Sequence, residues 1–402
     1  MRSRTSSDIE RRNYRRSSKI SCLARNTDDR AGRGSRPLPC SDKDIEELDL
    51  LTNLSAREHH VVGGVPGAKP PLRLAIIGCG AISESAHIPA ATHVKEVRLV
   101  GLVDTDVAHA QTLASKFGIE RAASRLEDVA DEVDAVVLAT PPHIRSTLAQ
   151  QALERGLHVL CEKPMANNSA ECQMMLSAAA ASARIIAIGH NYRFFPNRAF
   201  ARNLYKTGQL GRMLAVNVEQ GDRFGSSSRT LYTLRREMVP GGVLFNDGIH
   251  TLDMLFWWFG EPESFEYRDD SLGGLESNVE LELNYSDGGT AHFRLSRTCS
   301  LSNSVSMRFE HGELSFPIYD MAALRLRLNG RTGQLVLHTT PWDFVEIAAL
   351  QLRDFALAAL NDRSPSVPGE DGFRTVRFIE ECYFLASQRP RPSKTPLPGV
   401  PW

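Results

Sequence analysis

An apolar run that leads directly into a glycine-rich turn constrains the fold of this chain more than any other feature. The run Leu72–Ile77 is typical of a strand that is buried on both faces. The segment Gly78–Ser83 (GCGAIS) follows, and a helical pattern begins after it. This is the G-x-G-x-x-G pattern with a small serine in the third glycine position. It predicts a tight turn that brings the free N–H groups of a helix N-terminus close to a pyrophosphate.

A second strand, Arg98–Val103, ends at Asp104, which lies 26 residues after Gly78. An acidic residue near this spacing is expected to bind the adenosine ribose. Its carboxylate would accept from both ribose hydroxyls and repel a 2′-phosphate, and Asp106 adds a second negative charge. The sequence therefore predicts NAD as the cofactor in preference to NADP. The alternative is that Asp104 only caps the next helix.

Strands and helices alternate from residue 72 to residue 190, which indicates a parallel sheet with right-handed crossovers. Residues 72–190 are therefore predicted to form a doubly wound, Rossmann-type dinucleotide-binding domain. Its remaining elements are predicted as strands at 135–140, 157–160 and 185–188 and helices at 143–155 and 168–182.

Charged residues are unusual at the end of a buried strand. Glu162-Lys163-Pro164 follows the apolar run Leu157–Leu160, although lysine and glutamate are seldom buried unless they are needed. Proline holds Lys163 in an extended conformation, which gives its ammonium group a fixed direction. Because open α/β sheets bind ligands at the carboxyl ends of their strands, the sequence predicts a functional lysine here.

The pattern changes after residue 190. Several segments alternate between apolar and polar residues, which predicts strands with one covered face and one free or paired face. These segments are 212–220, 263–269, 278–286, 290–298, 304–310 and 323–328. Residues 191–388 are therefore predicted to form a second α/β domain with a large, mostly antiparallel open sheet. The open face is a candidate for self-association, and simple exposure to solvent is the alternative.

Polar residues lie at the start of an apolar helix that ends at Gly260. Asn246 and His250 are four residues apart, so they share one face, and Asp253 lies three residues beyond His250. A histidine in the first turn of an apolar helix needs a partner. The alternative is that Asn246 or Asp247 caps the helix and that His250 is a hydrogen-bonded core residue.

Composition bounds the partners and the location. The net charge of −1 over 402 residues gives no argument for a nucleic-acid partner. The seven cysteines show no metal-ligand spacing and fit reduced thiols in a cytoplasmic protein, so no metal site is predicted. No apolar stretch reaches the roughly 18 residues of a membrane helix, so no membrane association is expected.

The two ends of the chain are predicted to lie outside the domains. Residues 1–71 are predicted to be a disordered extension and a linker, with a short amphipathic helix within 41–60. An organellar transit peptide and a misplaced start codon are the alternatives for the basic first 36 residues. Residues 389–402 are predicted to be a proline-rich tail.

Together these motifs resemble the Gfo/Idh/MocA oxidoreductases, a family named for glucose–fructose oxidoreductase, inositol dehydrogenase and a rhizopine-catabolism protein. The resemblance covers about residues 72–388. It implies NAD(P)-dependent oxidation or reduction at a carbinol carbon of a sugar, cyclitol or sugar derivative, and homodimers or homotetramers formed through the open sheet. The matching segments are GCGAIS with His87 beyond it, Asp104, Thr140-Pro141-Pro142, GLHVLCEKP, GHNYRFFP and GGVLFNDGIHTLD.

The resemblance also implies that Lys163 and His250 are the catalytic pair and that Glu162 lies by the nicotinamide riboside. A desolvated lysine beside a positive ring has a lowered pKa, so it can remove a hydroxyl proton, and a histidine can relay that proton. The predicted cofactor-binding residues are Gly78, Gly80, Ala81, Ile82, Asp104, Thr140, Pro141, Glu162 and Lys163.

Two positions depart from the family pattern. Asn246 stands where many members carry an aspartate, so the catalytic set Lys163, His250 and Asn246 lacks that charge, and Asp247 is expected to point elsewhere. Arg145 stands where many members carry a histidine, and His143 lies two residues earlier.

The predicted substrate-binding residues are Tyr192, Arg193, Asn246 and His250. Arg193 could pair with a phosphate or carboxylate of the substrate, and an inter-domain salt bridge is the alternative. Further candidates are Arg223, Tyr232 and the pair Arg235-Arg236, which would suit a nucleotide-sugar. Two other functions stay open: a non-catalytic regulator that binds a dinucleotide, and elimination or hydrolysis through transient oxidation.

Overall fold

A computed structural model describes residues 69–223, 232–271, 275–328, 331–336 and 343–389 of the chain. The predicted helix within 41–60, nearly all of the predicted extension and linker, and the predicted tail beyond residue 389 lie outside these ranges. The chain divides into two compact units that do not follow chain order. One unit takes the described residues within 195–216 and 304–336, and the other takes those within 69–194, 217–303 and 343–389.

The second unit contains a six-stranded sheet in the order β3-β2-β1-β4-β5-β6, and all of its described pairings are parallel. The chain first winds outward from β1 to β3 and then starts again at β4 on the other side of β1. The prediction of a doubly wound parallel sheet is therefore confirmed. Its strands are β1 (Leu72–Ile77), β2 (Val97–Val103), β3 (Arg121–Ala123), β4 (Ala135–Leu138), β5 (His158–Cys161) and β6 (Ile186–Ile188).

The helices of this sheet lie close to their predicted positions. The helix after the glycine turn opens with a π-helical segment, η1, and continues as α3. Short 3-10 turns, η2 and η3, precede β4, and another, η4, follows β6. The elements are η1 (Ser83–His87), α3 (Ile88–His93), α4 (Val107–Phe117), η2 (Leu126–Asp128), η3 (Ala130–Glu132), α5 (Pro142–Glu154), α6 (Ser169–Ser182) and η4 (Asn191–Phe194).

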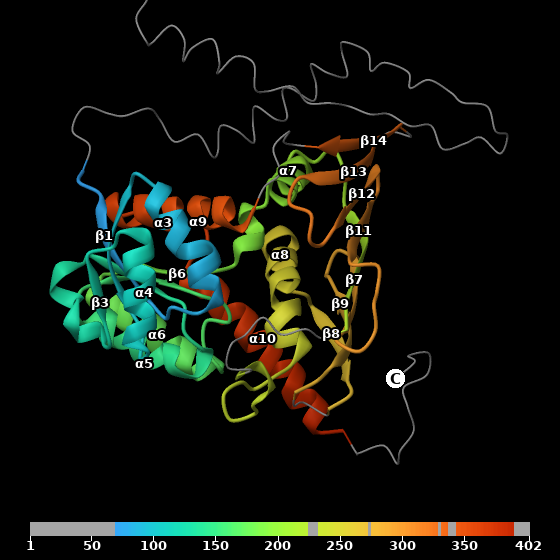
Figure 1. The fold of residues 1–402 in the computed structure, drawn as a ribbon. Coiled ribbons are helices and arrows are strands. Elements are labelled where there is room, and N and C mark those ends of the chain that lie inside the picture. The colour runs from blue at the N-terminus through green and yellow to red at the C-terminus, as the bar shows by residue number, and fades with distance from the viewer. Residues whose placement is uncertain (1–68, 224–231, 272–274, 329–330, 337–342, 390–402) are drawn as a thin grey trace, which may run out of the picture. The chain divides into compact units, whose positions relative to one another are not determined.

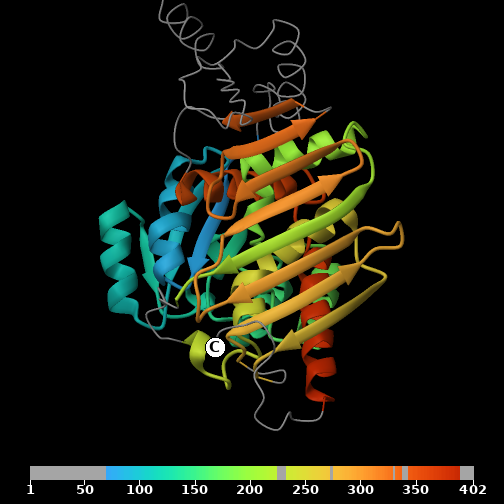
Figure 2. The ribbon, with the colours of Figure 1, turned by 90° about the vertical axis from the view of Figure 1, so that its right-hand side faces the viewer.

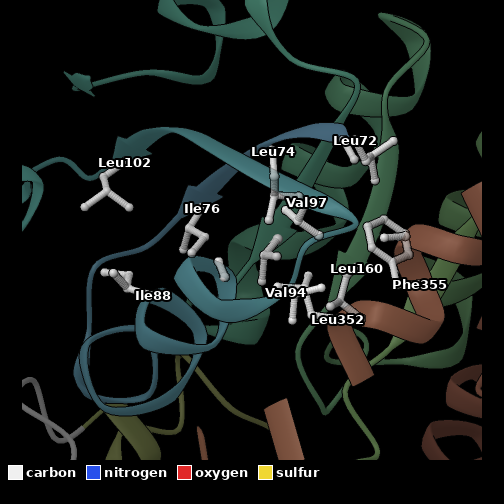
Figure 3. Packing of buried hydrophobic residues seen from close by; sticks show 14 of the residues in the cluster. Leu72, Leu74, Ile76, Ile88, Val94, Val97, Leu102, Leu160, Leu352 and Phe355 are labelled. Carbon is white, nitrogen blue, oxygen red and sulfur yellow. The ribbon is translucent and has the colours of Figure 1, made fainter. Parts of the chain in front are cut away.

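The core of the parallel sheet also takes in a helix from near the end of the chain. Leu74 and Ile76 on β1 belong to the same buried cluster as Leu352 and Phe355 on α9 (Phe344–Leu360). Figure 3 shows these side chains directed toward one another, and α9 lies beside α3 next to β1 (Figure 1). Residues 343–360, which the sequence assigns to the second domain, therefore complete the packing of the first.

The second sheet has eight strands in the order β14-β13-β12-β11-β7-β10-β9-β8, and every pairing with a described register is antiparallel (Figure 2). On β9, Val279, Leu281 and Leu283 are buried while Glu282 is exposed, as the alternating pattern predicts. The strands are β7 (Met213–Gly221), β8 (Ser264–Asp269), β9 (Asn278–Asn284), β10 (Thr290–Ser296), β11 (Ser304–Phe309), β12 (Gly312–Pro317), β13 (Ala323–Leu328) and β14 (Arg331–Val336).

Two helices of the second unit carry residues of the predicted site. The helix predicted after residue 246 opens with a second π-helical segment, η6 (Leu244–Gly248), and continues as α8 (Ile249–Phe259). Helix α10 (Gly369–Ser387) lies beside α8 (Figure 1). The remaining elements are η5 (Tyr232–Leu234) and, in the first unit, α7 (Pro196–Lys206).

Truncation of Phe355 is expected to destabilise the protein strongly. The ring is buried against β1, so Phe355→Ala should lower the free energy of unfolding by roughly 3–5 kcal/mol through lost burial and a residual cavity. Phe384→Ala on α10 is the matched control, because that ring is 61% exposed. Denaturant unfolding compares the two, and equal effects would contradict the assignment of α9 to this core.

Candidate active site

The glycine turn after β1 leaves an open space at the carboxyl end of the strand. Gly78 has a φ of 95°, and a Cβ there would lie 2.8 Å from the carbonyl oxygen of Ala139. A Cβ on Gly80 would meet no atom within 4 Å. Ala81 and Ile82 are exposed at the start of the following helix. This geometry leaves room for a ligand against the turn and the helix N-terminus.

Polar groups face the same strand ends. The Oγ1 atom of Thr140 is buried and has no hydrogen-bond partner among the described residues, and Pro141 precedes the first turn of α5. Asp104 accepts from the backbone N–H of Cys79 at 2.7 Å and from that of Asp106 at 2.9 Å. An orphaned hydroxyl, an open glycine turn and a carboxylate after β2 fit the parts of a dinucleotide.

The capping alternative for Asp104 is wrong. The N-cap of α4 is Asp106, whose carboxylate accepts from the backbone N–H of His109 at 3.0 Å. Asp104 lies two residues before this cap and braces the glycine turn through Cys79. Its carboxylate is therefore held at the end of β2, where the sequence places a ribose ligand.

Glu162 is fixed at the end of β5. Its Oε1 atom lies 2.8 Å from Nε2 of His87, and its Oε2 atom accepts from the backbone N–H of Lys163 at 3.1 Å. A Cβ on Gly189 would approach Oε2 to 3.0 Å, which explains the glycine in the GHNYRFFP segment. Burial tends to raise the pKa of Glu162, but its hydrogen bond with His87 and the charges of Arg145 and Lys163 hold that pKa below its ordinary value.

Arg145 fastens the turn that carries Glu162 and Lys163. Its side chain is buried, and Nε donates to the carbonyl oxygen of Thr140 at 2.7 Å. Its Nη1 atom donates to the carbonyl oxygens of Glu162, at 2.7 Å, and Pro164. The guanidinium thus joins the ends of β4 and β5 through main-chain groups, which a histidine with two ring nitrogens cannot do in the same way.

The Lys163 amine reaches the helix that bears His250. Its Nζ atom donates to the backbone carbonyl oxygen of Asn246 at 2.7 Å. Burial lowers the pKa of Lys163, Arg145 and Arg297 lower it further, and Asp247 and Glu162 oppose the shift. The strand-end lysine and the start of η6 therefore meet, as the sequence predicts.

Asn246 and His250 keep separate contacts. The Nδ2 atom of Asn246 donates to the carbonyl oxygen of Gly242 at 2.9 Å, and neither Asn246 nor Asp247 caps the helix. The His250 ring stacks on Tyr192, with ring centroids 4.6 Å apart and an interplanar angle of 18°. The capping alternative for Asn246 and Asp247 is therefore wrong, and Tyr192 forms a platform for the imidazole.

The side chain of Asp247 pairs with Arg297, and the expectation that it points away from the lysine stays a prediction. Asp247 contributes the largest charge effect on the pKa of Lys163, and its Oδ2 atom accepts from Nη2 of Arg297 at 3.0 Å. Residues 244–248 are π-helical and turn less per residue than an α-helix. A negative charge therefore lies near Lys163 although Asn246 stands at the family's aspartate position.

The guanidinium of Arg193 is bound by two carboxylates. Its Nη2 and Nε atoms donate to Asp253 at 2.6 and 2.9 Å, and Nη1 donates to Asp371 at 2.6 Å. His190 lies 3.8 Å from Asp253, and burial lowers the pKa of His190. This buried cluster joins η4 to α8 and α10, and the sequence could not reveal it because Asp371 lies 178 residues away from Arg193.

The other candidates lie on the segment before Gly241. Burial raises the pKa of Tyr232, the charge of Arg145 lowers it and that of Glu162 raises it. Arg223, Arg235 and Arg236 are exposed, and their contact with a substrate stays a prediction.

His143 has a buried Nδ1 atom without a partner among the described residues.

Comparison with known proteins establishes the family. Residues 72–190 match the model of the oxidoreductase family with an NAD-binding Rossmann fold, and residues 199–336 match the Gfo/Idh/MocA C-terminal domain. This chain belongs to the Gfo/Idh/MocA family of oxidoreductases. Its parallel-sheet domain is accordingly an NAD(P)-binding domain.

Curated relatives include sugar and cyclitol dehydrogenases. An uncharacterized oxidoreductase of Synechocystis sp. is 30% identical over 272 residues, which cover 67% of this chain and 72% of that protein. D-Glucoside 3-dehydrogenase of Escherichia coli is 29% identical over 201 residues, or 48% of this chain and 55% of that protein. An NADP(+)-dependent scyllo-inositol 2-dehydrogenase of Bacillus subtilis is 26% identical over 248 residues, or 60% of this chain and 75% of that protein.

Solved structures share the fold. The aldose–aldose oxidoreductase of Caulobacter crescentus, crystallised with glycerol, has a TM-score of 0.72 and 26% identity over 79% of this chain and 97% of that one. Levoglucosan dehydrogenase in complex with NADH and levoglucosan gives a TM-score of 0.72 with 20% identity over the same shares. At that identity the second likeness describes the fold alone.

The described residues hold no group of three or more His, Cys, Asp or Glu side chains that could bind a metal ion. None of their helices is both long and apolar enough to cross a membrane.

Loss of the Arg145 guanidinium should destabilise the protein. Arg145→Met removes the guanidinium donors from the carbonyl oxygens of Thr140, Glu162 and Pro164, so the free energy of unfolding should fall by about 1–3 kcal/mol. Arg155→Met is the control, because its partly exposed side chain should change stability by less than about 0.5 kcal/mol. Denaturant unfolding of both variants provides the comparison. An unchanged free energy of unfolding in Arg145→Met would refute the stabilising role of the Arg145 hydrogen bonds.

Proposed function

We propose that the protein transfers a hydride between nicotinamide and a carbinol carbon of a sugar, cyclitol or sugar derivative. The observation that carries the proposal is the 2.7 Å contact between the Lys163 amine and the Asn246 carbonyl, which brings the strand-end lysine to the helix of His250. Both residues lie in the same compact unit as the glycine turn. The substrate class is supported by the dehydrogenases of D-glucosides and inositols among the relatives.

Lys163 is the proposed proton acceptor. An alcohol is a very weak acid, so loss of hydride from its carbon needs a base close to the hydroxyl. Because burial and Arg145 lower the pKa of Lys163, its neutral form is more accessible than that of an exposed lysine. In the reverse direction the protonated amine would stabilise the developing alkoxide.

His250 and Asn246 are proposed to bind and orient the substrate. The stack with Tyr192 fixes the plane of the His250 ring, so its nitrogens have defined directions for a substrate hydroxyl. Asn246 holds the amine through its main chain while its side chain binds Gly242. The site set Lys163, His250 and Asn246 can thus act without an aspartate at position 246.

The proposed cofactor is NAD. When bound, the dinucleotide would supply the hydride acceptor or donor. Gly78, Gly80, Ala81 and Ile82 would leave room for its pyrophosphate, and Asp104 would accept from the adenosine ribose. Thr140, Pro141 and Glu162 would line the nicotinamide end, where the buried Thr140 hydroxyl still needs a partner.

Arg193 is proposed to position the site rather than to contact the substrate. Asp253 lies three residues beyond His250 on α8, so the ion pair with Arg193 fixes the helix close to the imidazole. Tyr192 precedes Arg193 on η4 and stacks on His250. Assembly into a homodimer or homotetramer through the C-terminal sheet and a cytoplasmic location stay predictions.

Removal of the Lys163 amine should abolish turnover without loss of cofactor. Lys163→Ala should lower kcat by about 10²–10⁴-fold, the usual contribution of a positioned acid or base. NADH titration should give an unchanged Kd, and Lys95→Ala is the control because that side chain is 79% exposed. In the wild type, kcat/KM for oxidation should rise with pH through the lowered pKa of Lys163, since only the neutral amine accepts a proton.

Normal turnover by Lys163→Ala would refute the mechanism. Retained binding of NADH with no turnover of any sugar or cyclitol by the wild type would instead favour a non-catalytic regulator that binds a dinucleotide.

Replacement of Asp104 should change the choice of cofactor. The carboxylate would repel a 2′-phosphate, so Asp104→Ser should raise the NADP/NAD ratio of kcat/KM by about tenfold or more. Asp106→Ser is the control for a general loss of charge, since Asp106 caps α4. An unchanged ratio in Asp104→Ser would exclude contact of this residue with the ribose.

A further inference from the structure

A buried carboxylate outside the proposed site binds the start of the helix that carries His250. Glu276, just before β9, is 1% exposed. Its Oε2 atom accepts from the backbone N–H of Gly242 at 2.7 Å, and its Oε1 atom accepts from Leu244 N–H at 2.8 Å and from the Tyr383 hydroxyl at 2.8 Å. Its own carbonyl oxygen accepts from Val243 N–H at 2.9 Å. Three successive N–H groups at this helix start are thus bound by one residue.

The contact with Glu276 requires glycine at both positions before η6, because a side chain has no room there. A Cβ on Gly242 would lie 1.9 Å from the carbonyl oxygen of Glu276, and a Cβ on Gly241 would lie 2.0 Å from the Tyr383 hydroxyl. Both distances are far inside van der Waals contact, and main-chain atoms of Glu276 cannot move aside cheaply. Any side chain here would push the helix start away from Glu276.

A continuous series of hydrogen bonds leads from Glu276 to Lys163. Glu276 binds the N–H of Gly242, whose carbonyl oxygen accepts from Asn246 through its backbone N–H at 3.0 Å and its Nδ2 at 2.9 Å. The carbonyl oxygen of Asn246 in turn accepts from the Lys163 amine at 2.7 Å. A shift of the glycine pair would therefore move the acceptor that orients the amine.

We propose that ionised Glu276 is a positioning residue, which holds the first turn of η6 so that the Asn246 carbonyl orients the Lys163 amine. This inference rests on the proposed function for the role of Lys163. In this role Glu276 contacts neither the substrate nor the cofactor. The carboxylate also places a negative charge at the positive end of the helix dipole of η6 and α8.

The surroundings of Glu276 make its charge sensitive to pH. The titratable groups described around it are Tyr267 and Asp269 on β8 and Cys382 and Tyr383 on α10. None of these four carries a positive charge. Burial raises the pKa of Glu276 to about 7, although its backbone and Tyr383 hydrogen bonds oppose the shift.

Protonation should therefore loosen the helix start near neutral pH. A protonated carboxyl group places a hydrogen on one oxygen, so that oxygen becomes a poor acceptor for a backbone N–H. As pH falls through about 7, the hydrogen bonds from the N–H groups of Gly242 and Leu244 to Glu276 weaken. The value of kcat then falls with the ionised fraction of Glu276.

Hydrogen exchange of the protein without substrate tests the contact directly. In the wild type, protection of the Gly242 and Leu244 amides, corrected for intrinsic rates, should fall between pH 8 and pH 6. In Glu276→Gln it should be lower at pH 8 and independent of pH. Tyr383→Phe removes one donor to the charged form, so the midpoint of the change should move to higher pH. If protection of these two amides in the wild type does not depend on pH, the inference is overturned.

Kinetics test the positioning role. Glu276→Gln should lower kcat about tenfold at pH 8, the effect of about 1.4 kcal/mol, with KM and the Kd for NADH changed by less than about twofold. It should also lose the limb of the kcat profile near pH 7. Glu282→Gln, on the exposed face of β9, is the control and should keep the wild-type kcat and the limb near pH 7.

The two hypotheses fail separately. If Lys163→Ala keeps normal turnover, the proposed function fails while the exchange result can still hold. If Glu276→Gln keeps the wild-type kcat and the limb near pH 7, the positioning role fails while Lys163 can still be the base. Thermal unfolding followed by circular dichroism identifies a Glu276→Gln protein that does not fold, and in that case Tyr383→Phe decides through the expected shift of the midpoint.

Discussion

Charged side chains that are buried or half-buried at the carboxyl ends of parallel strands must have partners that stay in place, and the rest of the site depends on this requirement. The partner of Glu162 is His87, and the partner of Lys163 is the carbonyl oxygen of Asn246. Arg145 binds main-chain carbonyl oxygens on both sides of the turn. Unpaired, each charge would cost several kcal/mol to bury, so the charges and the turn fix one another.

The helix that bears His250 is held at two points. Glu276 binds its first N–H groups, and Arg193 holds Asp253 one turn beyond the imidazole. Between them, Tyr192 stacks on the His250 ring. A helix fixed at both places keeps its polar groups in register with the strand end, which is the condition that the proposed proton transfer to Lys163 requires.

Two π-helical segments mark the same region. One follows the glycine turn and contributes His87, and the other contributes Asn246 and Asp247. Such segments are rare and occur often at functional sites. Asp247, on the second of these segments, pairs with Arg297, and its charge raises the pKa of Lys163. Periodicity read from a sequence assumes 3.6 residues per turn, and it fails wherever the helix widens.

The sequence by itself determined the parallel sheet, the glycine turn, the antiparallel sheet and the strand-end lysine, because each rests on local periodicity or on short-range turn chemistry. Only the tertiary structure decided which distant groups meet. Three contacts illustrate this: Glu276 with Gly242, 34 residues apart, Arg193 with Asp371, 178 residues apart, and α9 with β1, where Leu352 and Leu74 are 278 residues apart. Such contacts depend on packing and on the need to pair buried polar groups, and neither leaves a periodic signal in the chain.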